Sequence, residues 1–299
     1  MYHQIARNKR NSAVVIAGFL LVWLLAGYLI GAIAYGSSGA IAGAIILCLL
    51  GIGAAMFSYF FGSATVLAAV GAQEADPQQY QQLYNIVQTL AIGDGLPVPK
   101  VYVIDDPSPN AFATGRDPAH AAVTVTTGLL RIMNREEIEG VLAHEMSHVK
   151  NFDVRLLLVV TTMIGLAAVI ASMYWNGALR IRSRDDRAML AVFAIGIIFT
   201  LIAFLVGPLM QLALSRQRES LADVSGVDLT RNPAGLISAL KKIAQNDKPP
   251  ERFNHAVAAM CIDNPTEHHG TFFNHLFDTH PPIEERIAAL EKIASVKET

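Results

Sequence analysis

The chain alternates between long uncharged stretches and segments with the composition of a soluble protein. Between residues 11 and 73 there is no Lys, Arg, Asp or Glu. A helix that crosses a bilayer needs about 20 apolar residues, so this stretch is long enough for two such helices. The glycines and serines at 35–39 divide it and predict membrane-spanning helices at about 12–35 and 40–62.

Two later uncharged runs, 156–179 and 188–215, are also long enough to span a membrane. They flank a hydrophilic segment at 180–187 that carries four arginines. The expected fold class is therefore an α+β membrane protein, mainly helical, with about four transmembrane helices. The expected divisions are a transmembrane hairpin at 1–73, a soluble part at 74–154, a second hairpin at 155–215 and a second soluble part at 216–299.

The pattern of apolar and polar residues at 74–154 predicts a helix, a small sheet and a second helix. Helical character runs from Asp76 to Ile92 and ends at the Gly and Pro residues of 95–99. Short apolar runs predict strands at 101–104, 111–114 and 121–127. The second helix covers about 136–149, where Asn134 and Glu137 have the spacing of a capping box.

Composition narrows the class of protein. The chain is 53% hydrophobic and only 16% charged, with a mean hydropathy of +0.38, which is typical of a membrane protein. The net charge of −2 shows no basic excess, so we expect no nucleic-acid partner. The two cysteines, Cys48 and Cys261, lie too far apart in the sequence to suggest a disulfide framework or a thiolate metal site.

The sequence His144-Glu145-Met146-Ser147-His148 lies within the second predicted helix. Positions i and i+4 share a helix face, so both imidazoles can bind one metal ion. Zinc accepts neutral imidazole ligands and lowers the pKa of a bound water molecule to about 7. Glu145 would then act as the general base that removes the proton of that water as it attacks a peptide carbonyl.

A catalytic zinc ion usually has three protein ligands, and Glu219 is the best candidate for the third. Glu219 lies just after the last uncharged run. If the two runs between His148 and Glu219 both cross the membrane, or if neither does, Glu219 lies on the same side as His144 and His148. Asp223, one helical turn after Glu219, could accept a hydrogen bond from the other ring nitrogen of a zinc-bound histidine.

Six pieces of the chain carry a resemblance to a known family, at 97–101, 109–115, 126–130, 144–153, 215–223 and 279–287. In this order they resemble the HtpX-type membrane zinc endopeptidases, gluzincins related to the CAAX prenyl endoprotease. The resemblance implies one Zn2+ per chain, held by His144, His148 and Glu219, with Glu145 as the catalytic base, in a zincin-like domain formed by both soluble parts.

The resemblance also implies where substrate binds. An extended peptide would add as a strand to the edge formed by Asn110, Ala111, Phe112 and Ala113, so that backbone hydrogen bonds supply affinity without sequence specificity. His280 would be a further catalytic residue that stabilises the oxyanion, and Arg286 would bind an acidic partner near the metal.

The function that we expect is a membrane-bound zinc metalloendopeptidase in the quality control of damaged membrane proteins. Its partners would be the lipid bilayer and unfolded or membrane protein substrates, while the oligomeric state stays open. Basic residues before the first span place the N-terminus and the active site in the cytoplasm by the positive-inside rule. The four arginines at 180–187 oppose this rule, so the second hairpin either crosses despite them or only dips into the membrane.

Two alternatives remain. The first is an endoprotease that processes prenylated proteins, which would need more than four membrane helices. The second is an inactive membrane scaffold that keeps zinc for structure, although the intact Glu145 argues against it and a structural zinc site usually has a fourth protein ligand.

Overall fold

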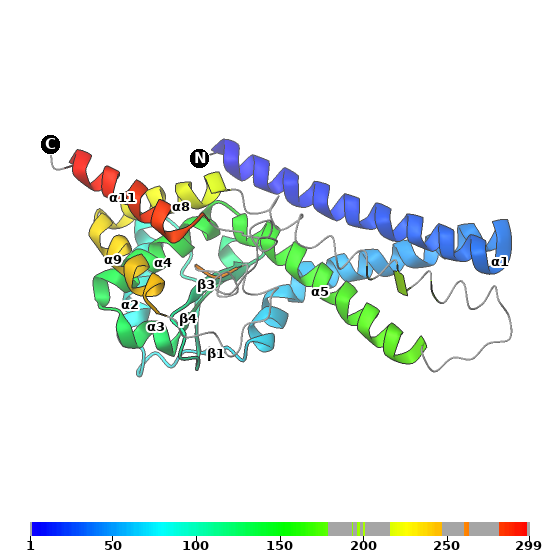
Figure 1. Ribbon diagram of the computed structural model, residues 1–299, viewed down its shortest axis with the longest axis horizontal. Helices are drawn as coiled ribbons and strands as arrows, with labels where there is room; N and C mark the ends of the chain where they lie inside the picture. Colours follow the sequence, from blue (N-terminus) through cyan, green and yellow to red (C-terminus); the bar gives the residue numbers. More distant parts are fainter. Residues whose placement is uncertain are drawn as a thin grey trace.

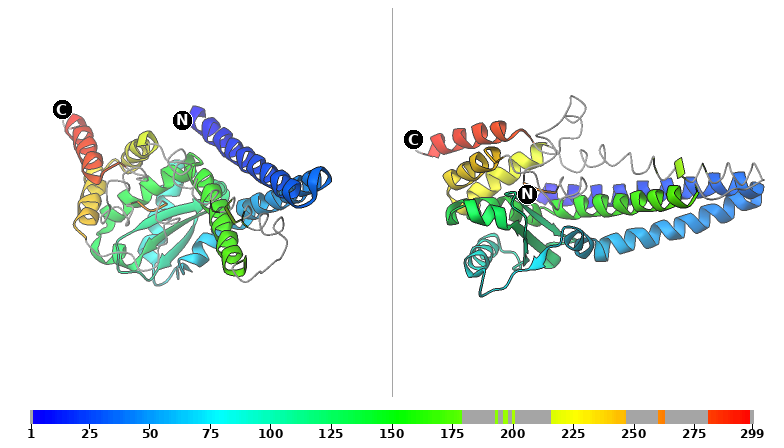
Figure 2. Two further views of the ribbon diagram at one scale, coloured as in Figure 1. Left: turned by 45° about the vertical axis from the view of Figure 1, so that its right-hand side comes forward. Right: turned by 60° about the horizontal axis from the view of Figure 1, so that its bottom comes forward.

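Helix α1 (Tyr2–Ala69) reverses direction at Gly36 and forms an antiparallel hairpin. The computed structural model describes residues 2–178, 193, 196–197, 200, 216–246, 260–262 and 281–297. Gly36 has a φ of 72°, a left-handed conformation that glycine adopts without a steric penalty. The hairpin and helix α5 (Asp153–Ala178) extend side by side from one end of the sheet-containing part, and the N-terminus lies beside that part (Figures 1 and 2).

Within the described residues, two helical segments are long and apolar enough to cross a membrane, Ile5–Ile33 and Tyr35–Ala69. Both are longer than the predicted spans at 12–35 and 40–62. Large apolar side chains on the hairpin are exposed, for example Leu21 and Leu49, as expected for a surface that contacts lipid. Helix α5 covers the third predicted span, whereas the fourth lies almost entirely outside the described residues.

Small residues hold the two arms of the hairpin together. Gly27 lies against Gly43 and Gly31 against Gly39, and a Cβ atom on any of them would overlap the facing backbone. Close approach at such positions is the usual basis of helix packing in membranes. The glycines therefore pack within the chain.

Among the residues that the structure describes, the sheet has four strands in the order β1-β2-β4-β3. Strand β2 (Lys100–Ile104) is parallel to β4 (Ala121–Thr126), while β1 (Gln73–Glu74) and β3 (Ala111–Gly115) pair in antiparallel fashion at the two edges. The three predicted strands agree with β2, β3 and β4. Strand β1 was not predicted, because two residues are too few for a hydrophobic pattern.

Helix α4 (Arg135–Lys150) lies between the sheet and helices α8 (Arg216–Thr230) and α9 (Pro233–Ala244). Its predicted capping box is confirmed, since Asn134 accepts a hydrogen bond from the Glu137 backbone and the Glu137 carboxylate accepts one in return. Helix α2 (Gln81–Asp94) packs beside it and starts later than predicted, because turns occupy 77–80. Helices α3 (Thr127–Ile132) and α11 (Ile283–Lys297) and the short η1 (Pro118–His120) complete the described elements.

Candidate metal centre

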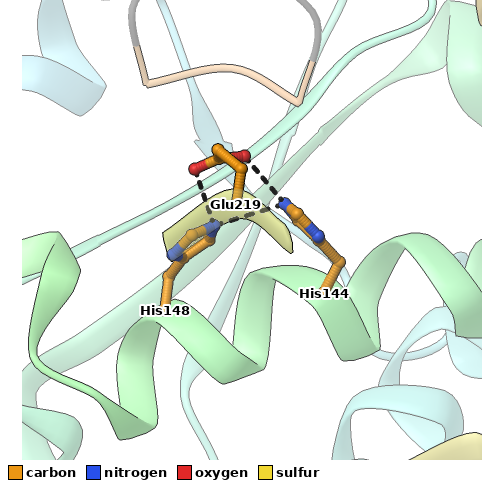
Figure 3. A group of neighbouring side chains, drawn as sticks. All are labelled: His144, His148 and Glu219. Carbon is orange, nitrogen blue, oxygen red and sulfur yellow. Dashed lines mark hydrogen bonds and ion pairs between the residues drawn. The ribbon is translucent and has the colours of Figure 1, made fainter. Parts of the chain in front are cut away.

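His144 and His148 lie one turn apart on α4, and both side chains point toward Glu219 on α8 (Figure 3). Their Nε2 atoms are 3.2 Å apart. The Glu219 carboxylate oxygens lie 3.6 Å from the Nε2 of His144 and 3.5 Å from the Nε2 of His148. All three residues are buried, and their ligand atoms lie within 4.8 Å of one another.

Helix α8 approaches α4 closely enough to deliver Glu219. Gly226, about two turns after Glu219, faces the His144 backbone, and a Cβ atom there would lie 3.0 Å from the His144 nitrogen. A larger residue at this position would push the two helices apart. Glycine therefore helps to bring the carboxylate to the two histidines.

The donor set fits a zinc ion. Bonds of about 2.0–2.1 Å in a tetrahedral arrangement place neighbouring ligand atoms about 3.3–3.4 Å apart. The observed separations of 3.2, 3.5 and 3.6 Å bracket that value. Two imidazole nitrogens and one carboxylate are also a donor set that catalytic zinc sites use.

Each histidine uses its other ring nitrogen to contact a carboxylate. The Nδ1 of His144 lies 2.8 Å from Asp223, the carboxylate that the sequence made a candidate partner for one of the two histidines. The Nδ1 of His148 lies 3.2 Å from Asp153. A hydrogen bond at Nδ1 selects the tautomer in which the Nε2 lone pair is available to a metal.

The carboxylates around the two histidines favour the positively charged form of each imidazole. Burial disfavours the charged form of His144, but Asp223 and Glu219 outweigh it and raise the pKa of His144 to about 9. Burial is likewise outweighed at His148, whose pKa is raised by Glu219 and Asp153. In the metal-free protein the raised pKa values favour the doubly protonated, positively charged imidazoles, and a metal ion that binds Nε2 would displace the proton there.

Arg286 of α11 binds Asp223 next to His144, and its Nη2 lies 3.4 Å from the Nδ1 of that histidine. Its Nε and Nη2 donate to the two carboxylate oxygens at 3.0 and 2.7 Å, and its Nη1 donates to the Ile262 carbonyl at 2.9 Å. Burial would raise the pKa of Asp223, but Arg286 and His144 keep that pKa well below its usual range. The expected acidic partner of Arg286 is thus Asp223, and His280 lies outside the described residues.

Glu145 is buried beside the two histidines. It contributes to a cavity of about 20 Å³ together with the three proposed ligands, and a cavity of this size can hold about one water molecule. The remaining walls are largely apolar and come from Ala113, Asp153, Val154, Leu157, Met260 and Cys261. Glu145 is therefore placed to contact a water molecule at the metal.

Within the described part of the chain, β3 lies at an edge of the sheet, and Ala113 brings it to the wall of the metal cavity. Asn110 and Phe112 face β4 with their backbone groups, and the Phe112 side chain is completely buried in the core. The backbone groups of Ala111 point away from β4. Its N–H donates to the Asn110 side chain, and its carbonyl accepts a hydrogen bond from the Ile262 N–H. By the alternation of an antiparallel ladder, the backbone groups of Ala113 also point outward.

Three residues around the centre were not predicted from the sequence. Asp153 contacts His148, and its other oxygen accepts hydrogen bonds from Arg218 at 3.3 Å and from Asn8 at 2.7 Å. All three are buried. Asp153 had a sequence signal, since it follows His148 by five positions at the start of the next helix, whereas Asn8 had none.

This arrangement defines a class of enzyme. Two buried histidines on one helix, a glutamate between them and a carboxylate from a second helix match the arrangement that zinc metallopeptidases use.

The chain belongs to peptidase family M48, whose model matches residues 77–294. It is 44% identical to the protease HtpX homolog of Ligilactobacillus salivarius (strain UCC118), over 97% of this chain and 99% of that protein. It is 40% identical to the protease HtpX homolog of Tropheryma whipplei (strain TW08/27), over 99% of each. The predicted resemblance is thereby confirmed.

Among solved structures, the fold is similar to that of Ste24p from S. mikatae. The TM-score is 0.51 at 18% sequence identity, covering 97% of this chain and 67% of that one. The relatives and the apolar hairpin make the protein a membrane metalloprotease.

Proposed function

We propose that the protein is a zinc endopeptidase anchored by about four transmembrane helices, with its active site facing the cytoplasm, that degrades damaged or misfolded membrane proteins. The observation that carries the proposal is the buried cluster of His144, His148 and Glu219 beside Glu145. The family and the exposed apolar surface of the hairpin support the same function.

The proposed chemistry is direct attack of water on a peptide carbonyl. A bound zinc ion supplies a Lewis acid and lowers the pKa of a water molecule to about 7. Glu145 accepts the proton of the attacking water and then delivers it to the leaving amine. Asp223 and Asp153 hold the two imidazoles in the orientation and tautomer that zinc requires.

We further propose that substrate adds to β3 as an extended strand. Only alternate residues of an edge strand offer their backbone outward, so Ala111 and Ala113 are the positions that would pair with a peptide. Ile262 already uses the Ala111 carbonyl, so a substrate that reaches this position must displace that contact. Backbone pairing suits an enzyme that accepts many unfolded sequences.

The decisive experiment compares purified wild type with Glu145→Gln and Glu219→Ala in detergent. We expect wild type to bind one zinc ion and to cleave casein. Glu145→Gln should keep the zinc and lose cleavage, while Glu219→Ala should lose both, because it removes a ligand. Cleavage by Glu145→Gln at the wild-type rate would disprove the assignment of the base, and stoichiometric zinc in Glu219→Ala would disprove the third ligand.

A further inference from the structure

Asn8, at the start of the first apolar helix, contacts the turn at 151–153 that follows α4, which we call the corner. Its side-chain amide donates to the Asn151 carbonyl at 2.8 Å and to the Asp153 carboxylate at 2.7 Å, across 145 positions of the chain. Both amide hydrogens are thus used. The side chain is almost completely buried, although Asn8 lies near the end of the chain.

Asp153 connects this contact to the proposed metal ligand His148. One carboxylate oxygen lies 3.2 Å from the Nδ1 of His148, and the other accepts the hydrogen bonds from Asn8 and Arg218. The amide of Asn8 therefore fixes the carboxylate that in turn fixes the imidazole ring. Such outer partners typically change metal affinity by about 10–100-fold when they are removed.

A second contact holds the same corner. The Lys9 ammonium lies 4.4 Å from the centroid of the Phe152 ring, and the Arg155 guanidinium lies 5.1 Å from it. Phe152 has a φ of 61°, a conformation that bulky residues adopt only when their surroundings hold them there. Asn8 and Lys9 therefore contact all three residues of the turn that places Asp153 under His148.

We propose that Asn8 is a positioning residue of the metal centre, through which the first membrane helix orients His148 by way of Asp153. The inference depends on the proposed metal ligands. Its consequence is that zinc is held tightly only when the first membrane helix is packed against the corner at 151–153. Folding of the membrane part and completion of the active centre are then coupled.

The test measures zinc affinity of the full-length protein in detergent, by competition with a chromogenic chelator, and the thermal unfolding temperature of the metal-free form. Asn8→Ala should weaken zinc binding by about 10–100-fold. Asn8→Asp, which has the same shape but places a carboxylate beside Asp153, should weaken it at least as much. Ser12→Ala is the matched control, because Ser12 is equally buried on the same helix and donates only to the Asn8 backbone. It should stay within about twofold of wild type.

The route through Asp153 is tested by the double variant Asn8→Ala with Asp153→Asn. If Asn8 acts through Asp153, the double variant should bind zinc no more than about threefold worse than Asp153→Asn alone. Three results would overturn the inference while wild-type zinc binding stands. They are unchanged zinc affinity in both Asn8 variants, a double variant whose loss equals the sum of the two single losses, and a loss in Ser12→Ala equal to that in Asn8→Ala. Absence of zinc from wild type would instead overturn the proposed function, and this inference with it.

Discussion

Replacement of Arg286 by Met should destabilise the protein far more than loss of an exposed ion pair on the same helix. Arg286 is 3% exposed and makes two hydrogen bonds to Asp223, which is also buried. Removal of one partner of a buried pair costs about 3–5 kcal/mol when the remaining charge is uncompensated, and the charged His144 beside Asp223 keeps the expected cost near the lower end of this range. Methionine fills a similar volume, so little of this cost would come from a cavity.

The matched control is Glu291→Gln. Lys241 and Glu291 form an ion pair of 2.8 Å that also joins α11 to its neighbour, but both side chains are about half exposed, at 50% and 53%. Pairs of this kind contribute about 0–1 kcal/mol. At about 2–4 °C per kcal/mol, the expected decreases in unfolding temperature are about 6–20 °C for Arg286→Met and at most about 4 °C for the control.

The measurement is thermal unfolding of the metal-free protein in detergent, followed by circular dichroism. Addition of Asp223→Asn to Arg286→Met removes the carboxylate charge that Arg286 no longer balances and should restore part of the lost unfolding temperature. If Arg286→Met unfolds at the same temperature as Glu291→Gln, the Arg286 pair does not stabilise the fold as argued. The single variant Asp223→Asn is measured as well. The same conclusion follows if adding Asp223→Asn lowers the unfolding temperature of Arg286→Met by as much as it lowers that of wild type.

Three further predictions concern zinc binding, the pH dependence of stability and the cleavage of substrate. Because the metal-free pKa of His144 is raised to about 9, zinc binding at pH 7 should release its proton, measured by calorimetry in buffers of different ionisation enthalpy, and this release should disappear above pH 9. The same raised pKa stabilises the metal-free fold fully below the unfolded value of 6.5, so its unfolding temperature should fall as pH rises through about 9; a rise would contradict the assignment. Ala113→Pro should slow cleavage of unrelated peptides alike while zinc stays bound, because it removes an outward N–H from the edge of β3. Loss of zinc together with activity would show that β3 supports the fold and does not bind substrate.

Sequence alone determined the features that depend on short-range spacing. The uncharged run at 11–73 predicted the hairpin because bilayer thickness sets a minimum helix length. The capping box of Asn134 and Glu137 and the shared face of His144 and His148 follow from the geometry of one helix. The cap and the metal-binding face involve residues within a few positions of one another, so the intervening chain leaves them little freedom.

Tertiary structure alone decided which distant residues complete the centre. The sequence made Glu219 and Asp223 candidates, but only the packing of α8 on α4 brings them to the histidines. Asp153 lies within the matching segment at 144–153. Its contact with His148 depends on the turn at Phe152 and on the hydrogen bond from Asn8. Contacts across 145 positions leave no periodic trace in the sequence, because loop closure and helix packing, and not local geometry, set them.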